Sequence, residues 1–168
     1  ESVADHYGLR RFAIWGAIGG SPAAMRYAVQ YPGRVSHLLL WGSFLRGAQV
    51  YGRSMDAMGA LLRQDWQIYT DTYAQVAFGW PHAETAAQYA ALMRASVTQQ
   101  AAAECLRALM AVDTRPDARQ ITVPTLVLAR RDAKFDAPAR AQELAGAIPG
   151  ARMVMLDGGS PAPFLGDT

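Results

Sequence analysis

A short glycine-rich turn between an apolar run and a helix start is the feature of this sequence that most constrains its fold. Residues 12–15 read FAIW, which is typical of a short buried strand, and residues 16–20 follow at once as GAIGG. Ser21 and Pro22 then supply a helix N-cap and a first-turn proline, so a helix is expected to begin there. The sequence therefore predicts a strand, a tight turn and a helix in immediate succession, which is a unit of α/β proteins.

The turn has the frame of the G-x-S-x-G motif, in which a serine stands on a strained bend between a strand and a helix. Ile18 occupies the serine position, and its hydrocarbon side chain has no group that can be deprotonated or acylated. The flanking glycines are expected because a side chain there would collide with neighbouring backbone. Ser21 lies three residues further on, and we expect it to cap the helix and not to replace the missing hydroxyl.

Four strands and two flanking helices are expected in the chain. The strands are predicted at residues 11–15, 35–41, 125–129 and 152–156. The helices are predicted at residues 22–31 and 138–148, each ended by a Pro-Gly pair. This alternation indicates a parallel sheet that is covered by helices. Residues 43–120, between the second and third strands, carry apolar residues at helical spacing and predict a long helical insertion.

Both ends of the chain resemble the α/β-hydrolase family. The resemblance is carried at residues 7–42 by RRFAIWGAIGGSPAAMRYAVQYPGRVSHLLLWG, and at residues 121–167 by VPTLVLARRD, LAGAIPGARMVML and PFLGD. In particular, the chain is similar to bacterial α/β-hydrolase domains that are often joined to nucleotide cyclases or regulatory DNA-binding domains. The resemblance implies a partial α/β-hydrolase fold, with a parallel sheet of about four strands, flanking helices and a helical cap insertion. Residues 1–42 and 121–168 would form the hydrolase core, and residues 43–120 the cap.

The resemblance also implies that the chain corresponds to the second half of such a domain. About four strands precede the turn in the family, and the loop after the third supplies an amide to the oxyanion hole. Strand 11–15 would be central in that sheet, and it lacks the lysines, prolines and bulges that protect natural edge strands. We therefore expect a missing N-terminal half-domain, or a second copy of the chain, to pair with this strand.

The resemblance locates the three catalytic positions of the family, and each holds a residue that cannot do the family's chemistry. In that chemistry a serine attacks, a histidine takes its proton, and an acid orients the histidine. The corresponding positions in this chain are Ile18, Pro161 and Ala133. Asp132 keeps a carboxylate one position early and is the candidate for a displaced acid, with Asp136 a weaker one. We favour a loop aspartate that caps the backbone or pairs with Arg130 or Arg131.

No cofactor motif competes with this frame. The sequence lacks a paired-histidine metal motif, a phosphate-binding loop and a dinucleotide fingerprint, so neither a metal nor a cofactor is expected. The single cysteine, Cys105, excludes an internal disulfide, is compatible with the reducing cytoplasm, and is expected to be buried on a helix. The three histidines are expected at the surface or at element boundaries: His6, His37 and His82.

Charge and hydropathy exclude two further classes of partner. The net charge of +2 comes from 16 basic and 14 acidic residues, and no arginine run is interleaved with aromatic residues, so no nucleic-acid partner is expected. No apolar run reaches the ~18 residues that a membrane-spanning helix needs, so no membrane association is expected.

These observations predict an α/β-hydrolase-like domain that has lost catalysis and that binds a small hydrophobic ligand or regulates a partner domain. We expect the aromatic residues of the insertion to form mainly the core of the cap: Trp66, Tyr69, Tyr73, Phe78 and Trp80. The alternative is that they line a ligand pocket, for which the candidate residues are Ile18, Trp66, Tyr69, Tyr73 and Phe78. Two alternatives stay open: an esterase-like enzyme that works through Asp132 or through residues of a missing segment, and a structural half-domain whose function is association.

Overall fold

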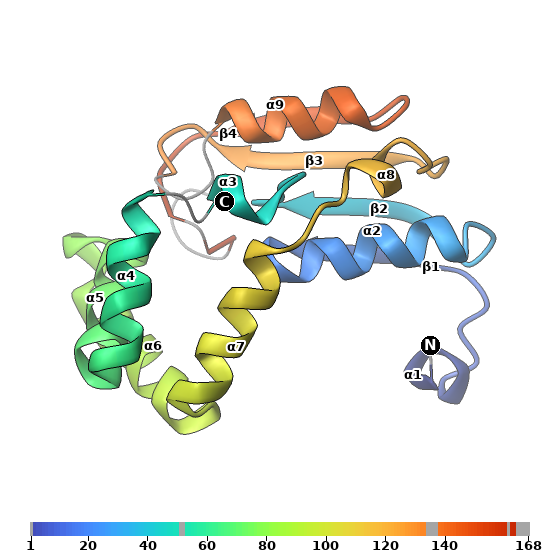
Figure 1. The fold of residues 1–168 in the computed structure, drawn as a ribbon. Coiled ribbons are helices and arrows are strands. Elements are labelled where there is room, and N and C mark those ends of the chain that lie inside the picture. The colour runs from blue at the N-terminus through green and yellow to red at the C-terminus, as the bar shows by residue number, and fades with distance from the viewer. Residues whose placement is uncertain (1, 51–52, 134–137, 161, 164–168) are drawn as a thin grey trace.

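The computed structural model describes residues 2–50, 53–133, 138–160 and 162–163, and its centre is one parallel sheet (Figure 1). The sheet has four strands in the order β1-β2-β3-β4, and each neighbouring pair is parallel. The strands are β1 (Phe12–Ala17), β2 (Val35–Trp41), β3 (Thr125–Arg130) and β4 (Arg152–Leu156). The four predicted strands are confirmed, and β1 extends two residues further than its predicted end.

Helices connect the strands and fill the insertion, as predicted. Those beside the sheet are α1 (Ser2–His6), α2 (Ser21–Gln30), α8 (Arg115–Ala118) and α9 (Pro138–Ala147). Those of the insertion are α3 (Gly47–Val50), α4 (Arg53–Gln64), α5 (Trp66–Phe78), α6 (Ala83–Ser96) and α7 (Gln99–Met110). Two short 3₁₀-helices are also present: η1 (Ile18–Gly20) and η2 (Trp80–His82).

Helices α2, α8 and α9 lie on one face of the sheet, and the hydrophobic core fills the space between (Figure 1). Large side chains of this core are fully buried or nearly so: Met25, Leu38, Leu40, Ile121, Val127 and Leu144. Burial of each such side chain contributes about 1.5–3 kcal/mol relative to exposure. The apolar runs of β2 and β3 therefore fix the centre of the fold.

The opposite face of the sheet is only partly covered. Side chains alternate between the two faces of a strand, and Gly16 faces α2, so its neighbour Trp15 points to the opposite face. Trp15 is 57% exposed, and Val154 on β4 is 38% exposed. Parallel sheets are normally buried on both faces. The predicted parallel sheet with flanking helices is confirmed, and its face opposite α2 is only partly covered within the described residues.

Strand β1 is at the edge of the described sheet, with β2 as its neighbour on one side. Beside it lies an apolar groove of about 430 Å³. The groove is lined by Val3, Ala4, Leu9, Phe12, Ile14, Trp15, Gly20, Ala24 and Tyr27. Three of the side chains in or next to it are large, apolar and exposed: Val3, Tyr7 and Leu9. An apolar edge strand of this kind is a site for pairing with further chain.

The two ends of the insertion lie side by side, where backbone hydrogen bonds join the segment after β2 to the segment after α7. The amide of Thr114 donates to the Leu45 carbonyl over 2.8 Å, and the amide of Gly47 donates to the Val112 carbonyl over 3.0 Å. The buried hydroxyl of Thr114 donates to the Leu45 carbonyl as well, over 3.0 Å. A Cβ on Gly47 would lie 1.7 Å from the Leu109 carbonyl oxygen, so only glycine fits there.

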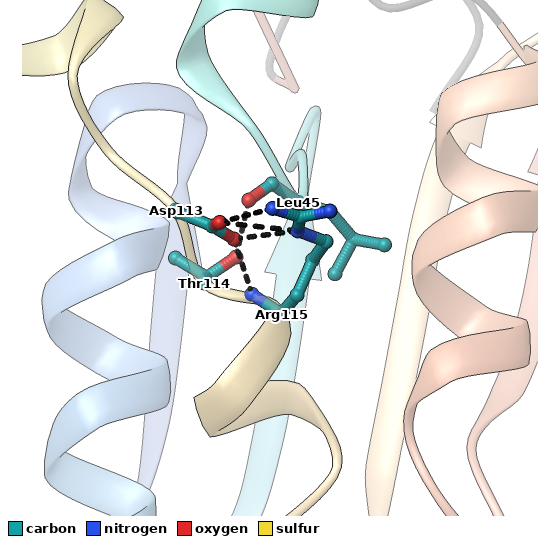
Figure 2. A network of polar contacts seen from close by, with 4 residues as sticks. All are labelled: Leu45, Asp113, Thr114 and Arg115. Carbon is teal, nitrogen blue, oxygen red and sulfur yellow. Dashed lines mark hydrogen bonds and ion pairs between the residues drawn. The ribbon is translucent and has the colours of Figure 1, made fainter.

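An ion pair flanks this junction. Figure 2 shows the Asp113 carboxylate accepting hydrogen bonds from the backbone amide and the guanidinium of Arg115. The side-chain hydrogen bond from Arg115 lowers the pKa of Asp113 from 3.8 to about 2. The pair holds the start of α8 against the end of the insertion.

Small side chains hold two helices of the insertion together. Helices α5 and α6 pack through the buried residues Ala74, Ala86 and Ala90, with Phe78 at the end of α5. Two large apolar residues of the insertion are exposed: Trp80 is 83% exposed and Leu92 is 60% exposed. The expectation that Trp80 belongs to the core is therefore wrong. Cys105 on α7 is exposed, so its predicted burial is wrong as well.

Candidate functional site

The turn after β1 holds Ile18 in a strained backbone conformation. Ala17 is extended, and Ile18 then adopts a φ of +48°, the one positive φ at a non-glycine residue in the described chain. This left-handed region crowds the Cβ of every L-residue, and a branched Cβ such as that of isoleucine suffers most. Such a conformation costs roughly 1–3 kcal/mol and persists only where the surroundings enforce it.

Hydrogen bonds from Ser21 help to enforce this conformation. The backbone amide and the side-chain hydroxyl of Ser21 both donate to the carbonyl oxygen of Ile18. Ser21 is fully buried and is the first residue of α2, with helical backbone angles, while Gly20 precedes it at the N-cap position. The prediction that Ser21 is the N-cap is wrong. Its hydroxyl is committed to the turn, so Ser21 does not supply a nucleophile.

The glycines of the turn differ in what they require. A Cβ on Gly16 would lie 2.7 Å from the Cβ of Ala24 and 3.0 Å from the Cα of Ser21, so β1 and α2 approach each other only because this residue is glycine. A Cβ on Gly20 would meet no atom within 4 Å. The expectation that both flanking glycines avoid a collision is confirmed at Gly16 and wrong at Gly20. A Cβ on Gly19 would lie 3.4 Å from the side chain of Leu109, so α7 lies beside the turn.

The loop after β3 holds Ala133, which the resemblance predicts to stand at the position of the family's acid. Ala133 is buried there, and the preceding residue, Asp132, is exposed. The two neighbouring arginines interact with Asp157, not with Asp132: the Arg131 Nε lies 3.2 Å from an Asp157 carboxylate oxygen, and the Arg130 Nη1 donates to the Asp157 carbonyl over 3.3 Å. The interpretation of Asp132 as the partner of Arg130 or Arg131 is therefore wrong. Asp136 lies outside the described residues.

The loop after β4 approaches the insertion. Pro161, at the family's histidine position, lies outside the described residues. Its neighbour Ala162 is buried and packs in the same cluster as Phe78 and Ala74 on α5. The loops after β3 and β4 also touch, since the amide of Asp132 donates to the Gly158 carbonyl over 3.1 Å.

The strand register gathers these loops at one edge of the sheet. Ala17 pairs with Trp41, Trp41 pairs with Leu128, and Arg130 pairs with Leu156, so the carboxyl ends of the strands lie together. Ligands of open α/β sheets bind in the crevice outside these ends. The Ile18 turn, the loop that holds Ala133 and the loop after β4 all start there.

The aromatic residues predicted to line a pocket follow one another along α5. Trp66 stacks on Tyr69 with ring centroids 5.7 Å apart, and Tyr69 stacks on Tyr73 at 5.9 Å. Tyr69 and Phe78 are buried, whereas Trp66 and Tyr73 are partly exposed. Phe78 lies beside the loop after β4 through Ala162. The structure thus connects the end of α5 with that loop, and connects the Ile18 turn with α7.

Sequence reasoning missed one residue at this edge, Arg130. Arg130 is the last residue of β3, and it is only 2% exposed. Its guanidinium lies over the ring of Trp41, with the Cζ 5.7 Å from the ring centroid. A charged residue at the carboxyl end of an otherwise apolar strand was the available signal.

Other chemistry is not assembled in the described part of the chain. His6 and His37 are exposed and His82 is half-buried, as expected. The described residues contain no group of three or more side chains suited to hold a metal ion. Every helix in those same ranges is too short or too polar to cross a bilayer.

A parallel sheet with a strand–turn–helix unit at β1 and a helical insertion after β2 matches part of the α/β-hydrolase architecture. Residues 1–159 match the model of the family described as serine aminopeptidase, S33, and the chain belongs to that family. No curated protein matches the chain.

Solved structures of bacterial hydrolases share this fold. A hydrolase from Oleispira antarctica has a TM-score of 0.83 at 15% identity, over 94% of this chain and 61% of its own. The enol-lactonase from Burkholderia xenovorans has a TM-score of 0.77 at 24% identity, over 96% of this chain and 63% of its own. An esterase from Exiguobacterium antarcticum has a TM-score of 0.77 at 20% identity, over 91% of this chain and 60% of its own. The chain therefore spans about three-fifths of the length of these structures.

Proposed function

We propose that this chain is a catalytically inactive α/β-hydrolase domain that binds a small hydrophobic ligand in place of turning over a substrate. The observation that carries the proposal is Ile18 at a φ of +48°. By the family pattern this turn is the nucleophile elbow, whose strain serves to present a serine. Here the strain remains and the side chain is unreactive, so the scaffold is kept without its chemistry.

The other two family positions support the same proposal. Ala133 is a small buried residue where the acid belongs, and a methyl group cannot orient a histidine. Pro161 stands where the family has its histidine, and proline has no side-chain base. A serine at position 18 alone would therefore have no partner to accept its proton.

The ligand site that we propose lies between the carboxyl edge of the sheet and the insertion, which then acts as the cap. Ile18 forms its floor, and Trp66, Tyr69, Tyr73 and Phe78 of α5 supply apolar wall. Two contacts support this placement: the loop after β4 packs on the end of α5 through Ala162, and Leu109 of α7 lies against Gly19. An apolar, cap-covered space at this edge is suited to a small hydrophobic molecule.

A second candidate function is esterase-like catalysis, and Asp132 is the observation that favours it. Its carboxylate is exposed and makes no hydrogen bond or ion pair with another residue of the described ranges, so it is available as a displaced acid or base. The structural neighbours include an esterase and an enol-lactonase. Residues from a further segment would be needed to complete such a site.

A third candidate is association through the sheet. The apolar groove beside β1 and the partly exposed face that carries Trp15 both fit further chain, and the solved structures are longer than this chain. Either an N-terminal half-domain or a second copy would pair with β1. Sedimentation of the purified chain tests this candidate, because a monomer whose β1 amides exchange freely with solvent contradicts it.

Hydrolysis of short-chain p-nitrophenyl esters tests the proposal against the esterase candidate. We expect the purified chain to show no turnover above the buffer rate, and we expect Asp132→Ala to make no difference. The matched control is Asp157→Ala, which removes a carboxylate of the neighbouring loop. Turnover that Asp132→Ala abolishes and Asp157→Ala leaves intact would establish the enzyme and end the proposal of an inactive domain.

A further inference from the structure

Arg130 is a buried cation that has no anionic partner among the described residues. Its side chain is almost completely buried, with 2% exposure. Arginine is almost never fully buried unless its charge is paired, because an uncompensated charge in a low-dielectric interior is strongly unfavourable. Within the described ranges, its one hydrogen bond is the 3.3 Å contact from Nη1 to the Asp157 carbonyl, which carries no net charge.

The acids of this edge do not neutralise Arg130. The Asp157 carboxylate is turned to Arg131, whose Nε lies 3.2 Å away. Asp132 follows in the same loop with an exposed side chain. Gly158 instead gives the guanidinium its space, because a Cβ there would lie 2.8 Å from the Arg130 Nη1.

The free donors of Arg130 form a fork. The Nε is buried and has no hydrogen-bond partner, and the Nη1 is the nitrogen that donates to Asp157. This leaves the edge of the guanidinium that Nε shares with Nη2, which presents two parallel N–H donors in one plane. That geometry matches the two oxygens of a carboxylate. The Arg130 Cζ lies over the Trp41 ring, 5.7 Å from its centroid, and this cation–π contact helps to fix the position of the guanidinium.

Arg130 is also placed beside the proposed ligand site. Leu40 faces α2 and Trp41 therefore faces the opposite side of the sheet, together with its register partner Leu128 and, two residues on, Arg130. Trp41 pairs on its other side with Ala17, the residue before Ile18. The guanidinium thus lies at the carboxyl edge, with β2 between its own strand and β1, the strand that ends at the Ile18 turn.

From this geometry we infer that Arg130 is an anion-binding residue and that the ligand of the domain is a carboxylic acid with an apolar body. The carboxylate takes the Nε/Nη2 fork of Arg130, and the apolar body extends toward Ile18 and the cap. This inference rests on the proposed ligand-binding function and names the class of its ligand. A monoanion fits because one unpaired guanidinium supplies the charge.

Calorimetric titration with octanoate and with octan-1-ol, which share a chain and differ in charge, tests the inference. We expect octanoate to bind at least about tenfold more tightly, the effect typical of hydrogen bonds to a charged group. Arg130→Gln removes the charge and is expected to abolish this preference. Arg130→Lys keeps the charge without the fork, and is expected to lose most of the preference even if Arg130→Gln does not fold. Arg131→Gln is the matched control, because Arg131 is exposed, and it should retain the preference.

The possible results distinguish the inference that the ligand is a carboxylic acid from the proposal that the domain binds a ligand at all. Equal binding of octanoate and octan-1-ol by the wild-type chain overturns the inference and leaves the ligand-binding proposal standing. A preference for octanoate that survives in both Arg130 variants also overturns the inference. Failure of both probes to bind contradicts the ligand-binding proposal together with the inference.

Discussion

Alanine substitution at the two glycines that flank the Ile18 turn should have opposite effects on stability. Gly16→Ala places a Cβ 2.7 Å from the Ala24 Cβ and 3.0 Å from the Ser21 Cα, and both of these atoms belong to α2. Relief of the overlap requires α2 to move away from β1, and overpacking of this kind costs about 1–3 kcal/mol. Gly20→Ala meets no atom within 4 Å, and Gly20 already has helical angles with a φ of −83°.

The same reasoning gives the magnitude for the second variant. Alanine at a compatible glycine position stabilises by about 0.4–1 kcal/mol, because the unfolded chain loses conformational freedom. The two variants should therefore differ by roughly 1.5–4 kcal/mol in the free energy of unfolding, or about 3–16 °C in melting temperature for a chain of this size. Urea unfolding followed by circular dichroism measures the difference directly. If Gly20→Ala destabilises as much as Gly16→Ala, the described packing of this turn is incorrect.

Two further predictions concern the junction of the insertion with the core. Gly47→Ala should prevent cooperative folding or strongly lower the melting temperature, because its Cβ would lie 1.7 Å from the Leu109 carbonyl oxygen; an unchanged melting curve would contradict this contact. The Asp113–Arg115 pair should add stability at pH values above 3.8 and lose it as the pH falls toward about 2, since the folded-state pKa of Asp113 is lowered. The difference in melting temperature between the wild type and Asp113→Asn should accordingly shrink over that range, and a difference independent of pH would refute the assignment.

The strands were predictable because their signal is local. The apolar run of β2 and that of β4 give the observed bounds, and the chain between β2 and β3 shows helical spacing throughout. Their parallel order follows from the helical connections between them and from the family resemblance. The succession of strand, turn and helix around Ile18 was also predictable, since the glycines of the turn and the Ser21-Pro22 pair are adjacent in sequence.

Burial across the sequence was not predictable in the same way. Trp80 is exposed although it is large and apolar, and the contact between α5 and α6 is made chiefly by alanines; the helical spacing of the insertion predicts neither feature. The roles of Gly16 and Gly20 look alike in sequence, and only the approach of α2 distinguishes them. The unpaired charge of Arg130 depends on Asp157, a residue 27 positions away that binds Arg131 with its carboxylate and Arg130 only with its carbonyl.

The most direct test of the account is whether a serine restores chemistry at the Ile18 turn. Ile18→Ser places a hydroxyl on the strained bend, but the account predicts no ester turnover above the buffer rate, because the base and acid positions remain Pro161 and Ala133. The informative comparison is the triple variant Ile18→Ser, Ala133→Asp and Pro161→His, assayed beside the single variant and the wild type. Turnover by the single variant would mean that a base exists elsewhere in the chain, and it would contradict the claim that this domain has lost its catalytic machinery.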